Sequence, residues 1–102
     1  METVVELTSF IRSAVGVLGN TEVAALIDHL AKNPESGDII RGSGGLRKLR
    51  WARAGGGKRG GARVIYYYVK QDWTVYLLLA YAKSAQEDLT PEQLNRLMQA
   101  MK

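Results

Sequence analysis

Basic side chains that could bind phosphate are concentrated in the middle third of this chain. Between Ile39 and Gln71 the sequence has nine Lys or Arg residues and no Asp or Glu. They are Arg41, Arg47, Lys48, Arg50, Arg53, Lys58, Arg59, Arg63 and Lys70. The other residues carry five basic and ten acidic side chains, so the net charge of +4 conceals two regions of opposite sign. A cationic region of this kind predicts a polyanionic partner, with nucleic acid as the first candidate.

Lys48 and Arg50 alternate with Arg47, Leu49 and Trp51, which is the spacing of a strand with two different faces. Charge on a strand can simply keep an edge soluble. Here, however, the charge has only one sign, and like charges on one face repel unless a partner neutralises them. We therefore predict a cationic groove for phosphates, which continues beyond this strand. Its further members are Arg53, the loop residues Lys58 and Arg59, and Arg63 on the next strand.

Arg63 begins a strand that is otherwise apolar and aromatic, ARVIYYYV. A partly buried arginine is costly unless it is paired, so two roles stay open. It could form a structural ion pair with an acid from either end of the chain, or it could bind a phosphate through its planar guanidinium. Tyr67 shares a face with Arg63, whereas Tyr66 and Tyr68 share the other. Such tyrosines usually pack in the sheet, although one or two could stack on bases.

Several other chemistries are disfavoured. The segment GGGKRG at residues 55–60 fits G-x-G-x-x-G, but a strand follows it where a dinucleotide site requires a helix. The sequence has no cysteine and a single histidine, His29, which excludes a thiolate zinc site and a ribonuclease built on paired histidines. We expect His29 to be exposed on a helix. No cofactor and no metal are expected.

Apolar periodicity predicts the elements that position these residues. We expect a strand over Thr3–Leu7, a helix from about Ser9 that ends at Gly19, and a second helix that ends at Asn33-Pro34. Three strands should follow, over 46–52, 62–69 and 75–81, and Pro91 should begin a last helix. The order βααβββα indicates an α+β fold in a single domain over residues 1–102. The absence of a span-length apolar run and of a basic N-terminal region predicts a cytoplasmic protein without a membrane partner.

Three segments, NPESGDIIRGSGGLRKLRWA, GKRGGARVIYYYV and YLLLAYAKSAQEDLT, together with VVELTSFIRSA, resemble the RelE/ParE superfamily of bacterial type II toxins. The closest resemblance is to the HigB-like branch. It implies a RelE-like fold, in which a twisted antiparallel sheet carries an N-terminal helix hairpin and a C-terminal helix. It also implies a metal-independent endoribonuclease that cuts mRNA in the 70S ribosome. The expected partner is a cognate, HigA-like antitoxin with a helix-turn-helix domain. The toxin would be bound to operator DNA only through this antitoxin.

The resemblance also implies site residues. The basic residues of the family's first central strand correspond to Lys48 and Arg50, its next-strand arginine to Arg63, and its basic residue after the last strand to Lys83. Leu89 and Thr90 occupy the region of the family's catalytic tyrosine, which leaves Glu87 as an alternative general base. Arg63 and Lys83 would hold the scissile phosphate, and a lysine could act as base. The nucleic-acid-binding set would be Arg47, Arg53, Lys58, Arg59 and Tyr67.

Two other functions are compatible with the sequence. A ParE-like inhibitor of DNA gyrase would share the fold without RNA chemistry. A non-catalytic RNA- or ribosome-binding module would keep the cationic surface alone.

Overall fold

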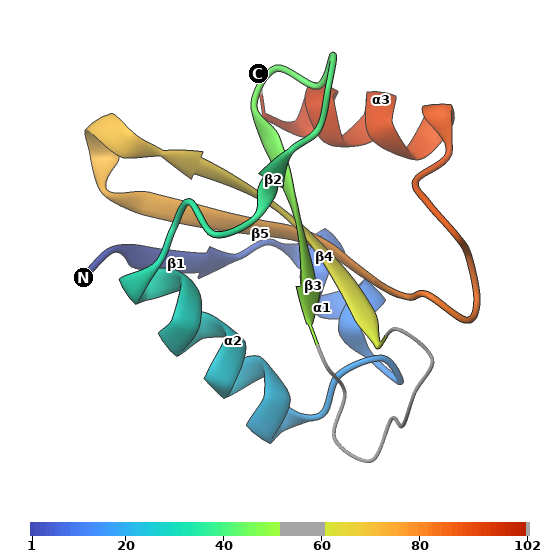
Figure 1. Cartoon of the computed structure of the whole chain (residues 1–102), viewed down its shortest axis with the longest axis horizontal. Coiled ribbons are helices and arrows are strands. Elements are labelled where there is room, and N and C mark those ends of the chain that lie inside the picture. The colour runs from blue at the N-terminus through green and yellow to red at the C-terminus, as the bar shows by residue number, and fades with distance from the viewer. Residues whose placement is uncertain (52–60, 102) are drawn as a thin grey trace.

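The computed structural model describes residues 1–51 and 61–101 of the chain (Figure 1). The described residues confirm the α+β class, with two helices near the N-terminus and one near the C-terminus. In chain order the elements are β1 (Thr3–Glu6), α1 (Thr8–Ala14), α2 (Asn20–Lys32), β2 (Asp38–Ile39), β3 (Leu46–Trp51), β4 (Ala62–Val69), the 3-10 turn η1 (Lys70–Asp72), β5 (Thr74–Ala82) and α3 (Pro91–Ala100).

The strands form one sheet in the order β1-β5-β4-β3-β2. The pairs β3–β4 and β4–β5 are antiparallel, as the resemblance implied, and so is the pair β2–β3. In contrast, β1 runs parallel to β5, with Thr3 opposite Thr74 and Glu6 opposite Leu77. The sheet is therefore mixed. Apolar periodicity reports which face a strand buries and not the direction of its neighbour, so only the structure shows the parallel edge.

Each face of the sheet packs against helices, and the two faces carry separate cores. On one face Val64, Tyr66 and Leu77 pack with Phe10 of α1 and Leu26 of α2. On the other face Leu46, Ile65 and Tyr81 pack with Leu97 of α3. The middle strand β4 is buried from Ala62 to Tyr66, because both cores cover it. Figure 1 shows α3 and α2 on different sides of the twisted strands. A side chain on β3 or β4 therefore faces either α3 or the helix pair.

The helix bounds differ from the expected ones at the first hairpin. Helix α1 ends at Ala14 rather than near Gly19, because the backbone turns at Gly16, whose φ of +78° favours glycine. Helix α2 begins directly after Gly19, whose N–H donates to Glu22 Oε1 at 2.7 Å. At α3 the prediction is confirmed. Pro91 is its first residue, and Thr90 and Gln93 form a capping box.

A short strand that the sequence did not predict lies between α2 and β3. Asp38 and Ile39 of β2 pair with Lys48 and Arg47 of β3. Two residues are too few to show a strand period, so pairing with β3 rather than local propensity defines β2. The hairpin between β4 and β5 contains η1 and a left-handed Trp73, with φ of +54°.

Among the described residues, no helix has the length and apolar content needed to cross a bilayer.

Candidate nucleic-acid interface

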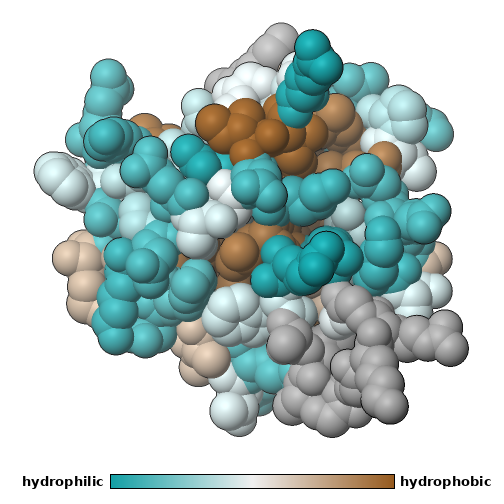
Figure 2. All heavy atoms as spheres, viewed as in Figure 1, coloured by the Kyte–Doolittle hydropathy of each residue, from teal (hydrophilic) through white to brown (hydrophobic). Residues whose placement is uncertain are grey.

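Three of the predicted phosphate ligands lie on one face of the sheet. Arg50 of β3 is opposite Arg63 of β4, and Lys48 is opposite Ile65. Residues paired across antiparallel strands project to the same side, so all three side chains share the α3 face. In Figure 2 hydrophilic side chains lie next to the hydrophobic patch beside α3. The β3–β4 register thus assembles three positive charges on one surface.

Arg63 is held rigidly, because only 8% of it is exposed and it lies on the middle strand. Its Nη1 donates to the carbonyl oxygen of Ala62 at 3.3 Å. Across β4 and β5 it is opposite Tyr81, which is itself buried. A guanidinium fixed in this way has lost most of its conformational entropy before any ligand binds.

Tyr81 is a site residue that the sequence analysis missed. Burial and, to a lesser extent, the nearby Asp88 carboxylate raise its pKa to about 12, against the opposing effect of the Arg63 guanidinium. The hydroxyl is therefore protonated at neutral pH. Its oxygen is buried and has no hydrogen-bond partner among the described residues. Tyr81 lies in an apolar strand, YLLLAY, where nothing in the sequence separates it from a core tyrosine; only its register with Arg63 does so.

The segment after β5 folds back towards the cationic face. Lys83 Nζ donates to the Glu87 carbonyl oxygen at 3.0 Å, and Asp88 Oδ1 lies 3.2 Å from Lys48 Nζ. The Glu87 side chain is exposed. Asp88, rather than Glu87, is thus the carboxylate that the structure brings to Lys48. The sequence analysis named Lys83 and Glu87 but not Asp88, because the two acids are adjacent and only the fold distinguishes them.

The Asp88 carboxylate accepts two hydrogen bonds, from Lys48 Nζ and from the N–H of Leu89 at 2.8 Å. The Leu89 N–H, together with the charges of Lys48 and Lys83, lowers the pKa of Asp88. Asp88 is therefore ionised at neutral pH and neutralises part of the cationic face. Lys48, while it donates to this carboxylate, is a charged donor rather than a proton acceptor.

Two predicted nucleic-acid ligands, Arg47 and Tyr67, have contacts within the fold. Arg47 lies on the face opposite Lys48, where its Nη1 donates to the carbonyl oxygens of Gly37 at 2.7 Å and Glu35 at 3.1 Å. Tyr67 does share the Arg63 face, as predicted, but it packs in the α3 core beside Met98 and Met101. The structure does not bring either residue together with Lys48, Arg50 and Arg63. The predicted loop ligands Arg53, Lys58 and Arg59 lie outside the described residues.

His29 is half-buried, not exposed as expected, because its ring packs against Trp51 with the centroids 5.3 Å apart. Its Nε2 lies 3.0 Å from Ser36 Oγ. It belongs to the helix-pair face, opposite the face that carries Lys48, Arg50 and Arg63. Within residues 1–51 and 61–101, no group of three or more His, Asp or Glu side chains could hold a metal ion.

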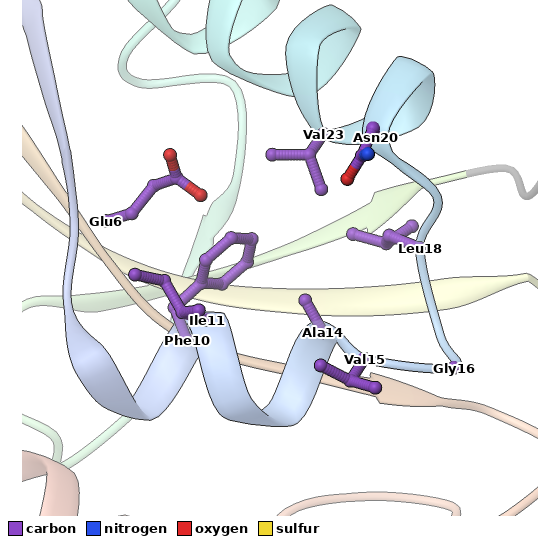
Figure 3. Close-up of a pocket in the computed structure, with 9 residues that line it drawn as sticks. All are labelled: Glu6, Phe10, Ile11, Ala14, Val15, Gly16, Leu18, Asn20 and Val23. Atoms are coloured by element: carbon purple, nitrogen blue, oxygen red, sulfur yellow. The ribbon is translucent and has the colours of Figure 1, made fainter.

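A separate groove of about 460 Å³ lies between α1 and the start of α2 (Figure 3). Phe10, Ala14, Leu18 and Val23 form the apolar part of its wall, and Glu6 and Asn20 are its polar side chains. One carboxylate and one amide provide no base, acid and charge stabilisation that converge on a substrate. The cationic face remains the candidate site.

Comparison with known proteins identifies the family. The sequence model described as "RelE toxin of RelE / RelB toxin-antitoxin system" matches residues 15–102. This chain belongs to the RelE toxin family.

Solved structures show the same RelE fold at low sequence identity. A double arginine-to-alanine mutant of the E. coli toxin RelE in the free state is 13% identical, with 98% of this chain and 96% of that chain covered and a TM-score of 0.62. RelE in the intact E. coli RelBE toxin–antitoxin complex is 14% identical, with coverage of 80% and 96% and a TM-score of 0.59. The RelBE2 toxin–antitoxin complex of Mycobacterium tuberculosis gives 22% identity, coverage of 79% and 96% and a TM-score of 0.58.

Proposed function

We propose that this RelE-family toxin is a ribosome-dependent endoribonuclease that cleaves translated mRNA without a metal ion, and that it belongs to the HigB-like branch. One observation supports the proposal above others. Lys48, Arg50 and Arg63 share one sheet face, with Lys83 at its border. A surface of this kind can neutralise the charge that develops when a phosphodiester is attacked.

In the proposed reaction the 2′-hydroxyl of a ribose attacks the adjacent phosphorus. The 2′-O–P bond forms as the P–O5′ bond breaks, which yields a 2′,3′-cyclic phosphate and a free 5′-hydroxyl. A base takes the 2′ proton, and an acid gives a proton to the leaving 5′ oxygen. No oxidant, reductant or metal is required for this balance. The protein must supply a base, an acid and charge stabilisation.

The geometry supports different roles for the site residues. Arg63, rigid and nearly buried, would stabilise the charge of the phosphorane, with Lys83 beside the same phosphate. Arg50 would bind the neighbouring backbone. Lys48 donates to Asp88 in this structure, and it would act as base only in its neutral form, after it had lost a proton. The Glu87 carboxylate is exposed and remains the alternative base.

The partner of this toxin would be a cognate antitoxin, HigA-like and with a helix-turn-helix domain. The solved RelBE structures are toxin–antitoxin complexes, which supports an antitoxin as the first partner. The 70S ribosome and its mRNA would be the targets, in the cytoplasm, and operator DNA would be reached only through the antitoxin. An antitoxin segment that carries acidic residues over the cationic face would mask Arg50 and Arg63.

The test is primer extension on a message in a reconstituted bacterial translation reaction with the purified toxin. We expect new 5′ ends within translated codons, which disappear when initiation is blocked. Equal cleavage of free mRNA would contradict the dependence on ribosomes. If no cleavage occurs and gyrase supercoiling is inhibited, the ParE-like alternative holds. If neither occurs while the protein binds ribosomes, the non-catalytic module holds.

A further inference from the structure

The Asp88 carboxylate occupies a position where an anionic ligand of the cationic face would bind. Its Oδ1 lies 3.2 Å from Lys48 Nζ, and the charge of Lys83 also acts on it. A carboxylate in contact with a lysine is chemically equivalent to one edge of a phosphate: two oxygens that share a negative charge. About 66% of the Asp88 side chain and 35% of the Lys48 side chain are exposed. Ion pairs with such exposure are weak, so another anion can replace Asp88.

Close to this carboxylate lies the Tyr81 hydroxyl, which forms no hydrogen bond of normal geometry within the described residues, although Asp88 is near enough to raise its pKa. Only 5% of Tyr81 is exposed, and its oxygen is buried without a hydrogen-bond partner in the described part of the chain. Buried hydroxyls nearly always have a partner, so an unused one requires an explanation. Tyr81 is directly opposite Arg63, and both Asp88 and Arg63 are near enough for their charges to act on its hydroxyl. A phosphate oxygen beside Arg63 could accept the missing bond.

We propose that Asp88 is the resident counter-ion of the phosphate site, and that Tyr81 is a substrate-binding residue whose hydroxyl donates to the RNA phosphate that displaces Asp88. The displacing phosphate takes the place of Asp88 against Lys48, so Lys48 keeps an anionic partner when RNA binds. This inference rests on the proposed function, since it requires RNA at the cationic face. It adds two residues, Tyr81 and Asp88, that the family resemblance did not assign.

Asp88→Asn tests the counter-ion. The probe is a short 2′-O-methyl RNA, which cannot undergo the 2′-hydroxyl attack, and binding is followed by fluorescence anisotropy. We expect the variant to bind about two- to fivefold more tightly, the range that an exposed ion pair of this type permits. Glu92→Gln is the matched control: it removes the same charge from the same C-terminal segment, and no contact with Lys48 is described for it. Its effect should be clearly smaller.

A double-mutant cycle separates the contact from general charge. In a Lys48→Gln background the gain in RNA affinity from Asp88→Asn should fall by at least half, because the main partner of the carboxylate is gone. An undiminished gain would show that Asp88 acts through net charge alone and would overturn its role as counter-ion.

Tyr81→Phe tests the donor, because it removes the hydroxyl and keeps the ring. We expect binding of the same RNA to weaken about tenfold, as for a lost hydrogen bond to a charged group. The variant should be at least as stable to urea as the wild type, because a hydroxyl without a partner is removed. A merely structural role would give the reverse, lower stability with unchanged binding, and that result would overturn the proposal.

The outcomes distinguish this inference from the proposed function. If the wild type fails to bind the RNA, or if Lys48→Gln and Arg63→Ala bind it as well as the wild type does, the nuclease proposal fails and this inference fails with it. If those two variants bind poorly but Asp88→Asn matches Glu92→Gln and Tyr81→Phe binds normally, only the inference fails.

Discussion

Arg50 and Arg63 are direct partners across β3 and β4, so two guanidinium groups project side by side from one face of the sheet. Like charges at such positions destabilise a sheet. The chain nevertheless places them on its middle strand and the neighbouring strand. A phosphate backbone bound across both side chains would offset this repulsion.

Replacement of Arg50 by glutamine should therefore stabilise the protein and weaken its binding to RNA. We expect the free energy of unfolding to rise by about 0.2–1 kcal/mol, measured by urea denaturation. The slope of the logarithm of the RNA-binding constant against the logarithm of the salt concentration should decrease in magnitude by about one. Arg12→Gln, which removes the same charge from the exposed end of α1, is the control and should give neither effect. A less stable Arg50→Gln protein would contradict the repulsion.

Tyr66 anchors the loop before β2, and its loss should reduce stability without an effect on cleavage. Its hydroxyl donates to the Pro34 carbonyl oxygen and accepts from the Gly37 N–H, both at 2.8 Å, on the helix-pair face. In Tyr66→Phe the Gly37 N–H stays buried without this acceptor. The free energy of unfolding, measured by urea denaturation, should therefore fall by about 1–3 kcal/mol. Tyr68→Phe removes only a 3.3 Å contact with Glu2 and should change stability less. Equal stability of the two variants would show that the Tyr66 hydroxyl is not the anchor.

Gly37 should tolerate no side chain, for a related reason. A Cβ at this position would lie 2.8 Å from Tyr66 Cε1 and 3.1 Å from the Lys48 carbonyl oxygen. Gly37→Ala should lower the free energy of unfolding by about 1–3 kcal/mol, the usual effect of overpacking. Gly42→Ala offers a comparison, because it has open space but a φ of +72°, so its effect reports backbone strain alone. If contact with Tyr66 matters, the two variants should have different melting temperatures.

Alkaline pH should destabilise the wild type through Tyr81. Its pKa is about 12 in the folded protein, against 10.0 for an ordinary tyrosine. Between these pH values the unfolded chain has released the phenol proton and the folded protein has not, so stability falls as pH rises. Tyr81→Phe should lose less stability between pH 10 and pH 12 than the wild type does, as measured by urea unfolding across this range. Parallel pH profiles for the two proteins would contradict the raised pKa.

Much of this fold could be predicted from the sequence because strong local signals agree with it. The alternation in LRKLRW correctly separates Lys48 and Arg50 from Arg47, and Thr90-Pro91 correctly marks the start of α3. The parallel pairing of β1 with β5 and the short β2 could not be predicted, because tertiary pairing alone defines them.

The candidate site was predictable only in its cations. Clustered basic residues indicate an anion-binding surface, and the register confirms that three of them share a face. The neutral and acidic residues around them carry no such signal. Tyr81 resembles any core tyrosine, and Asp88 resembles its neighbour Glu87, until the fold places one beside Arg63 and the other beside Lys48.

The central claim, that this cationic face cleaves RNA, is tested most directly through Arg63. Single-turnover cleavage of a ribosome-bound message is measured for the wild type, Arg63→Ala and Arg63→Lys, with urea unfolding to verify that each variant is folded. If the guanidinium stabilises transition-state charge, Arg63→Ala should cleave roughly 10²-fold more slowly or worse, and Arg63→Lys should recover only part of the rate because it lacks the planar fork. A folded Arg63→Ala protein that cleaves at the wild-type rate would contradict the account.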